Sequence, residues 1–226
     1  MMDSHFVIFI MAIDVSQWKE PFVLFGNGEI PSHQIPLDQL KRAKSILCVD
    51  GGATNLTQLG FAPNIILGDL DSVESKSFDC PIVSLKNQHK TDLQKSLDWC
   101  IDNSITELSL IGFSGKDDDH WMAALWTLVT YYDKINLTFY SNHSMVLCMK
   151  GDQIFESVPK QTISIIPTSE NIKLSVAGLK YPINDAELLP PSFGTRNEAI
   201  GHSFNIIASD MVWVFRNFNN DFAEKL

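Results

Sequence analysis

Short apolar runs alternate with helix-like segments along the first two-thirds of the chain, and this alternation restricts the fold more than any other feature. The apolar runs lie at 22–25, 45–49, 64–68, 81–85, 107–113 and 135–141. Between them, 36–44, 53–60 and 121–132 have the pattern of helices, and Thr91 forms a capping box with Gln94 at the start of another helix. Strands that alternate with helices predict a parallel sheet with helices packed on it.

The pattern changes after about residue 145, where strand-like runs follow one another with no helix between them. These runs lie at 145–150, 153–158, 162–167, 172–178, 203–209 and 211–217, and we expect a tight turn at Ser209–Asp210 between the last two. They predict a small antiparallel sandwich or barrel. The expected fold is therefore α/β: an N-terminal mostly parallel sheet with flanking helices in 21–145, plus a C-terminal all-β sandwich domain in 146–226.

Residues 1–20 are expected to form an N-terminal extension. Its apolar run, Phe6–Ile13, is shorter than the roughly 20 residues that a membrane-spanning helix needs. The run also lacks the basic flank and the small-residue cleavage site of a signal peptide. An extra strand or an ordered leader is the favoured interpretation.

The chain is acidic, with a formal net charge of −10. It has no cluster of Lys and Arg, so the sequence argues against a nucleic-acid partner. An acidic protein needs a metal ion or a cradle of backbone amides to bind an anionic substrate. The four cysteines form no Cys-x-x-Cys pair, and Cys48, Cys100 and Cys148 lie in apolar patterns, which favours a reducing cytoplasm over a disulfide framework or a zinc site. No membrane partner is expected.

Two aspartates follow the apolar run at 64–68, with one residue between them. Residues two apart in an extended chain point the same way, so Asp69 and Asp71 can converge on one point. Two carboxylates held that close repel each other unless a cation lies between them. Oxygen ligands at a strand end suit Mg²⁺, so the pair predicts a magnesium site, although Gly, Asp and Ser are also ordinary turn residues.

Further polar residues are expected at the same sheet edge, because ligands of open parallel sheets bind beyond the carboxyl ends of the strands. Asp50 ends another strand, and Gly51 and Gly52 after it allow a phosphate to approach the backbone closely. Asp92 lies in the first turn of the capped helix, where it suits either a metal or the helix dipole. Lys90 suits either a phosphate or solvent. The loop 112–120 is acidic, and its aspartates suit either a ligand site or a helix start.

In this order and spacing, the motifs resemble those of the thiamine pyrophosphokinase family over about Phe22–Phe215. "VDGGA" at 49–53 is similar to the family's nucleotide loop, and "GDLDS" at 68–72 to its metal motif. "QHKTD" at 88–92 and "GFSGKDDDH" at 112–120 are similar to its Thr-Asp segment and its glycine-rich loop. In the second domain, "TISIIP", "GLKYP" and "GTRNEAIG" resemble the strands and loop of the thiamine-binding sandwich.

The resemblance implies an enzyme that transfers the pyrophosphoryl group of ATP to the hydroxyethyl oxygen of thiamine and releases AMP. It implies a homodimer with sites between subunits, Mg²⁺ as the cofactor, and ATP as the co-substrate. The metal and catalytic residues would be Asp69, Asp71 and Asp92, with Asp71 as the candidate base. Nucleotide contacts would come from Asp50, Gly51, Gly52, Ser72, Lys90, Thr91 and Asp119, and thiamine contacts from Gln88, Tyr181, Thr195 and Asn197.

Two positions depart from the family pattern. Asp117 occupies the place of an arginine in the glycine-rich loop, and His89 the place of an aspartate ahead of the Thr-Asp pair. Two alternatives therefore stay open beside the kinase. One is a non-catalytic sensor of thiamine or nucleotide on the same scaffold, which Asp117 favours and the clustered acids disfavour. The other is a magnesium-dependent phosphotransferase or hydrolase that acts on another substrate.

Overall fold

The structure, a computed structural model, describes residues 15–68, 78–189 and 194–218. The apolar run Phe6–Ile13 and three predicted site residues, Asp69, Asp71 and Ser72, lie outside these ranges. The part of the extension that is described contains a short 3₁₀ helix, η1 (Val15–Gln17). Trp18, which follows η1, packs against α3 of the sheet domain, with its ring centroid 6.1 Å from that of Trp99.

Six parallel strands form the predicted N-terminal sheet. They are β1 (Phe22–Phe25), β2 (Ser45–Val49), β3 (Ile65–Gly68), β4 (Ile82–Ser84), β5 (Glu107–Ile111) and β6 (Asn136–Tyr140). Their order across the sheet is β6-β5-β1-β2-β3-β4. The chain therefore builds outward from β1 in one direction and then returns to add β5 on its other side. This topological switch lies between β1 and β5, where open α/β sheets bind ligands.

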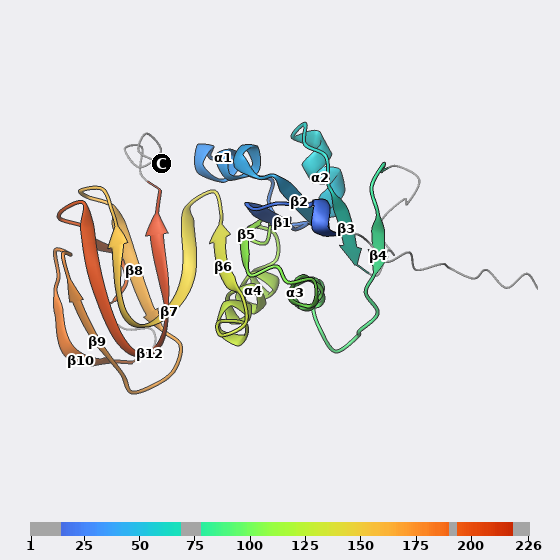
Figure 1. Cartoon of the computed structure of the whole chain (residues 1–226). Helices are drawn as coiled ribbons and strands as arrows, with labels where there is room; N and C mark the ends of the chain where they lie inside the picture. The colour runs from blue at the N-terminus through green and yellow to red at the C-terminus, as the bar shows by residue number, and fades with distance from the viewer. Residues whose placement is uncertain (1–14, 69–77, 190–193, 219–226) are drawn as a thin grey trace, which may run out of the picture.

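Helices cover both faces of this sheet. They are α1 (Gln34–Arg42), α2 (Gly52–Gln58), α3 (Asp92–Asp102) and α4 (Asp118–Thr130). Figure 1 shows α1 and α2 on one side of the strands and α3 and α4 on the other. The predicted α/β arrangement is confirmed.

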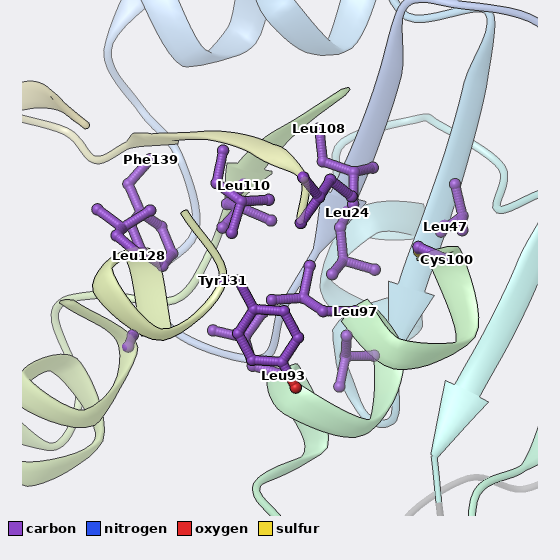
Figure 2. Packing of buried hydrophobic residues seen from close by; sticks show 14 of the residues in the cluster. Leu24, Leu47, Leu93, Leu97, Cys100, Leu108, Leu110, Leu128, Tyr131 and Phe139 are labelled. Atoms are coloured by element: carbon purple, nitrogen blue, oxygen red, sulfur yellow. The ribbon is translucent and has the colours of Figure 1, made fainter. Parts of the chain in front are cut away.

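Each face of the sheet contributes alternate strand residues to its own core, because successive side chains of a strand point in opposite directions. Val23, Phe25 and Cys48 pack with residues of α1 and α2. Leu24 and Leu47 pack on the opposite face with Leu93, Leu97 and Cys100 of α3, as Figure 2 shows. The near-continuous apolar runs of the sequence are explained by this burial on both faces.

The C-terminal part is built from antiparallel strands. They are β7 (Ser144–Glu156), β8 (Thr162–Pro167), β9 (Ile172–Ala177), β10 (Ile183–Leu188), β11 (Asn197–Glu198) and β12 (Ser203–Asn217). The first half of β12 pairs with β9 and its second half with β8, while β7 pairs along both halves. Their inward side chains form a separate core that includes Phe204, Ile206 and Val214. The predicted strand-rich second part is confirmed.

The expected tight turn at Ser209–Asp210 is wrong. β12 continues through these residues with a β-bulge between Ala208 and Val212, opposite β7. The bulge is held by side chains, since Ser209 Oγ accepts from Lys173 N at 2.9 Å and Asp210 Oδ1 from Met211 N at 2.8 Å. Polar residues that signal a turn in the sequence therefore bend one long strand here. The expected break between 150 and 153 is likewise absent, since both runs belong to β7.

The two parts share one sheet and part of one core. β7 pairs with β6 through Val146 opposite Phe139, so the strand-rich part continues the parallel sheet. Trp213 of β12 lies in the same apolar cluster as Phe139 and Val146. Its indole Nε1 donates to Leu125 O of α4 at 3.0 Å. The packing therefore links the parts on both sides of residue 145.

The cysteines give a testable consequence of this packing. Cys48 and Cys100 are fully buried, and burial raises their pKa values well above the usual range for a thiol. Burial likewise raises the pKa of Cys148 to about 12. Because the thiolate is the reactive form, we expect iodoacetamide at pH 8 to modify Cys80, which is less buried, before the other three. Peptide mapping over time tests this order, and early modification of Cys48 or Cys100 in folded protein contradicts the described core.

Candidate functional site

The carboxyl ends of the parallel strands bring most of the predicted nucleotide and metal residues to one edge. Asp50 follows β2, and Gly68 ends β3 directly before Asp69. A crossover helix begins where its preceding strand ends, so α2, α3 and α4 all start at this edge. Gly52, Asp92 and Asp119 stand in the first turns of these helices.

Asp50 lies directly over the end of β3. Its backbone has the positive φ of 42°, and its N–H donates to Leu67 O at 3.0 Å. The side chain is buried, and its carboxyl group occupies the space that a Cβ at Gly68 would need. Glycine is therefore required at 68 in this arrangement. The contact places one carboxylate beside the residue that precedes the Asp69–Asp71 pair.

Glycines allow the neighbouring strand ends to approach each other at backbone distance. Gly28 N donates to Gly112 O at 2.5 Å, and Glu29 N donates to Ser114 O at 2.7 Å, so the loops after β1 and β5 are joined at the topological switch. A Cβ at Gly52 would lie 2.8 Å from the carbonyl oxygens of Phe25 and Gly26. The glycines of this edge thus have a packing role that any larger side chain would disturb.

Asn27, in the loop after β1, contacts residues of α2 and of the loop after β5, and it was not among the residues predicted from the sequence. Asn55 Nδ2 donates to Asn27 Oδ1 at 3.1 Å, and Lys116 Nζ lies 3.4 Å from the same oxygen. A Cβ at Gly51 would lie 2.8 Å from Asn27 Nδ2. The only signal in the sequence was a Gly-Asn-Gly tripeptide directly after an apolar strand.

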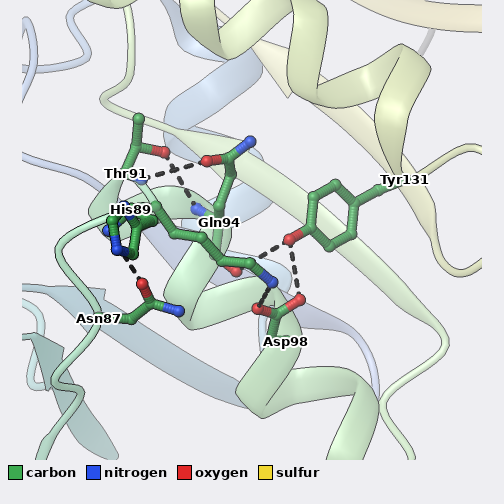
Figure 3. Close-up of polar contacts among 7 residues, drawn as sticks. Asn87, His89, Thr91, Gln94, Asp98 and Tyr131 are labelled. Carbon is green, nitrogen blue, oxygen red and sulfur yellow. Dashed lines mark hydrogen bonds and ion pairs between the residues drawn. The ribbon is translucent and has the colours of Figure 1, made fainter.

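The start of α3 is fixed by the predicted capping box, which is confirmed. Thr91 Oγ1 accepts from Gln94 N at 3.3 Å, and Gln94 Oε1 accepts from Thr91 N at 3.1 Å, as Figure 3 shows. Lys90 Nζ lies 2.5 Å from Asp98 Oδ2, and the Tyr131 hydroxyl donates to Asp98 Oδ1 at 2.8 Å. Thr91 and Lys90 therefore already have protein partners, and Gln88 lies exposed in the loop ahead of them.

Asp92 is the first residue of α3, and its side chain is 43% exposed. Its Oδ1 lies 2.5 Å from Nζ of Lys95, whose side chain is only 8% exposed. The capping of α3 does not use the Asp92 carboxylate, because Thr91 and Gln94 supply it. Asp92 is therefore accessible to a ligand from the sheet edge, and the sequence analysis did not select the lysine beside it.

The acidic loop before α4 forms the start of that helix, three residues earlier than the predicted Trp121. Asp117 is the N-cap residue, and its side chain makes no capping hydrogen bond. Asp119 Oδ1 accepts from His120 N at 2.8 Å in the first turn. Asp117, Asp118 and Asp119 are all exposed, so three negative charges face solvent beside the glycine-rich loop.

The predicted thiamine residues of the strand-rich part gather around one loop. Tyr181 lies between β9 and β10, and its side chain is 62% exposed. Asn197 is buried and holds this loop, since its Oδ1 accepts from Tyr181 N at 3.0 Å and its Nδ2 donates to Tyr181 O at 2.6 Å. Thr195 is exposed nearby in the sequence, two residues before Asn197.

This loop lies far along the sheet from the acidic edge. Five strands, β12, β7, β6, β5 and β1, stand between β9 and β2 in the strand order. At about 4.8 Å per strand, the separation along the sheet is roughly 30 Å. Figure 1 shows β9 and β10 at one end of the molecule and β3 and β4 at the other. One chain therefore does not bring Tyr181 to Asp50 or Asp92.

No group of three His, Cys, Asp or Glu within residues 15–68, 78–189 and 194–218 is arranged to hold a metal ion, and Asp69 and Asp71 lie outside these ranges. A cavity of about 430 Å³ is lined by Glu107 and Asn136, which begin β5 and β6, so it opens at the opposite edge of the sheet. No helix in the described ranges is long and apolar enough to cross a membrane.

The fold and this edge together define a two-part protein: a doubly wound α/β part with acidic residues at its strand ends, and an antiparallel strand-rich part. Known proteins combine the same parts. The family description "Thiamin pyrophosphokinase, catalytic domain" matches residues 37–139, and "Thiamin pyrophosphokinase, substrate-binding domain" matches residues 145–215. The chain belongs to the thiamin pyrophosphokinase family.

Relatives from two organisms are similar over most of their length. Thiamine pyrophosphokinase of Bacillus subtilis is 29% identical over an alignment of 151 residues, and the match covers 62% of this chain and 71% of that protein. Thiamin pyrophosphokinase 1 of Caenorhabditis elegans is 26% identical over an alignment of 180 residues, and the match covers 72% of this chain and 74% of that protein.

Solved structures of such proteins share the fold. The crystal structure of thiamine pyrophosphokinase from Bacillus subtilis superposes with a TM-score of 0.75 at 21% identity and covers 88% of this chain and 98% of that chain. The crystal structure of yeast thiamin pyrophosphokinase also superposes with a TM-score of 0.75, at 16% identity, and the match covers 91% of this chain and 88% of that chain.

Proposed function

We propose that this protein is a thiamine pyrophosphokinase that transfers the pyrophosphoryl group of ATP to the hydroxyethyl oxygen of thiamine. The products are thiamine diphosphate and AMP. In this reaction the thiamine oxygen forms a bond to the β-phosphorus, and the bond from that phosphorus to the bridging oxygen of AMP breaks. The observation that carries the proposal is the match to both the catalytic and the substrate-binding parts of one family, in order, along one chain.

The carboxylates at the sheet edge suit Mg²⁺ in their chemistry. Magnesium prefers oxygen ligands and uses one or two carboxylates together with substrate phosphates. Asp92 is accessible, and Asp50 packs over Gly68, the residue directly before Asp69 in the sequence. We assign Asp69, Asp71 and Asp92 as the residues that hold the ion, which would neutralise the triphosphate and polarise its β-phosphorus.

The remaining residues of this edge orient the nucleotide and receive a proton. Pyrophosphoryl transfer depends mainly on positioning and on charge neutralisation. The glycine-lined loops give phosphate oxygens access to the backbone, and Lys116 adds a positive charge beside Asp117. A carboxylate accepts the proton of the thiamine hydroxyl, and Asp71 is the proposed base.

The thiamine end is proposed to bind at the loop that carries Tyr181. Thiamine is a cation, and an exposed aromatic face attracts a cation. Asn197 serves this site by holding the Tyr181 backbone, while Thr195 and Gln88 are exposed and available for polar contacts. In this division, 21–145 carries the nucleotide chemistry, and 146–226 recognises thiamine together with Gln88 from the loop ahead of α3.

The separation of the two groups of residues supports a homodimer. About 30 Å of sheet lies between Tyr181 and the acidic edge in one chain, whereas the reaction requires thiamine and ATP to be in contact. A second copy that places its Tyr181 loop near Asp92 resolves this conflict. We propose an active site between two subunits, in a protein of the cytoplasm.

The function is tested by incubating the protein with ATP, Mg²⁺ and thiamine and following the products by ³¹P NMR and chromatography. Thiamine diphosphate and AMP are expected in equal amounts, and a thiamine analogue without the hydroxyl group should give neither. Tight binding of thiamine with no release of AMP would favour the non-catalytic sensor of thiamine or nucleotide. If thiamine does not react but another alcohol in a panel does, the result would favour a magnesium-dependent phosphotransferase that acts on another substrate.

Replacing Tyr181 with alanine tests the thiamine end of the site. The KM for thiamine is expected to rise about tenfold, because a cation on an aromatic face gains up to about 2 kcal/mol. The KM for ATP should change less than about twofold. Steady-state kinetics with each substrate varied checks this, with Tyr181→Phe as the control that keeps the ring. Equal rises in both KM values would contradict the assignment.

A further inference from the structure

The buried lysine at the start of α3 has no explanation in the packing of the helix. The Lys95 side chain is 8% exposed, whereas the lysine side chains of the other ion pairs in the described ranges are 40% to 58% exposed. Burial disfavours an ammonium group unless a negative partner compensates for the lost hydration. Asp92 provides such a partner, with 2.5 Å between Lys95 Nζ and Asp92 Oδ1.

The position of Lys95 on the helix adds to this cost. It is the fourth residue of α3, close to the N-terminus, where the helix dipole disfavours a positive charge. Leu93 and Leu97 of the same helix are buried in the apolar core. At a buried position between them in the sequence, an apolar residue would be expected. The acidic Asp92 favours a cation at this position, and α3 packs against β2 and β3, whose carboxyl ends form the acidic sheet edge.

We propose that Lys95 is a positioning residue that holds the Asp92 carboxylate and couples the metal to the nucleotide. This inference rests on the proposed function, which makes Asp92 a metal ligand. A fixed ammonium beside this carboxylate repels a bare divalent cation but attracts a triphosphate, so the site binds the metal weakly alone and well together with nucleotide. Coupling of this kind between two ligands is typically about 5- to 150-fold.

The chain offers variants that separate charge from packing. Lys95→Met removes the charge and keeps the length, Lys95→Gln is a second neutral variant, and Lys95→Arg keeps the charge. The matched control is Lys41→Met. Lys41 pairs with Asp38 at the same i,i+3 spacing on α1, with 3.1 Å between Nζ and Oδ1, but its side chain is 58% exposed.

The experiment measures the dissociation constant of Mn²⁺ by EPR, without nucleotide and with the α,β-methylene analogue of ATP. In the wild-type protein the analogue is expected to tighten Mn²⁺ binding. Lys95→Met and Lys95→Gln should reduce this enhancement about tenfold. Lys95→Arg and Lys41→Met should stay within about twofold of the wild type. Thermal melting of each variant confirms that it is folded before binding is measured.

Two results overturn the inference. One is that the analogue tightens Mn²⁺ binding in both neutral variants as much as in the wild type. The other is that Lys95→Arg loses as much of this tightening as Lys95→Met, which would assign the effect to packing and not to charge. Either result leaves the proposed function intact if the wild type still forms thiamine diphosphate. A wild type that forms none, while Mn²⁺ and nucleotide still bind in a coupled way, overturns the function and leaves the role of Lys95 standing.

Discussion

Replacing Asp92 with asparagine is expected to lower kcat for thiamine diphosphate formation by about three orders of magnitude. A carboxylate that holds the metal contributes several kcal/mol to transition-state stabilisation, and each 1.4 kcal/mol is about tenfold in rate. The fold should tolerate the change, because Asp92 is 43% exposed and the cap of α3 is made by Thr91 and Gln94. Initial rates and thermal melting of the same preparation measure both effects.

The matched control for this variant is Asp102→Asn. Asp102 is the last residue of the same helix, it is exposed, and it lies about 15 Å from Asp92 at about 1.5 Å per residue. The substitution makes the same change in net charge and should leave kcat within about twofold of the wild type. If both variants lose activity equally, the effect belongs to the charge of the helix, and Asp92 has no special role.

Replacing Trp213 with alanine is expected to lower the free energy of unfolding by about 3–5 kcal/mol. Trp213 is 7% exposed, its ring packs edge-on against that of Trp126 at 4.9 Å, and its Nε1 donates to Leu125 O. Domains of this size have only about 5–15 kcal/mol of stability, so the loss is a large share of the total. Urea unfolding, followed by circular dichroism, measures it.

Trp213→Phe separates packing from the hydrogen bond. The phenyl ring keeps most of the apolar contact with α4, but the Leu125 carbonyl loses its donor, so we expect a loss of about 1–2 kcal/mol. Both variants should unfold in a single transition, because β6 pairs with β7 and the core around Phe139 includes Val146 and Trp213. Two separate transitions would show that the parts before and after residue 145 are energetically independent.

The architecture could be predicted because its signals are local. Apolar runs that end in glycine, separated by helical spacing, are sufficient to indicate a parallel sheet, and the Thr91–Gln94 capping box fixes one helix start within the sequence itself. The joining of runs into β7 and β12 could not be predicted. Polar residues such as Ser209 and Asp210 also occur in bulges, and only the pairing of β12 with β7 distinguishes a bulge from a turn.

The site was predictable in its residue types and less so in its contacts. The spacing of the aspartates in the motif at 68–72 indicated a metal site. The motif requires glycine at 68 because the carboxyl group of Asp50 packs against it, and this tertiary contact is not visible in the sequence. Lys95 was missed because a lysine in a helix is usually solvated, and its burial depends on how α3 packs. The contact of Asn197 with the Tyr181 loop was likewise not visible in the sequence, because the Oδ1 and Nδ2 atoms of its one amide group bond a backbone 16 residues away.

The most direct test of the proposed metal site is ³¹P ENDOR spectroscopy of Mn²⁺ bound to the protein with the α,β-methylene analogue of ATP. We expect one bound Mn²⁺ with couplings to phosphorus in the wild type, and loss of this species in Asp92→Asn and in Asp71→Asn. Bound Mn²⁺ without phosphorus coupling, or the same spectrum in all three proteins, would contradict the claim that these aspartates hold the ion that carries the triphosphate.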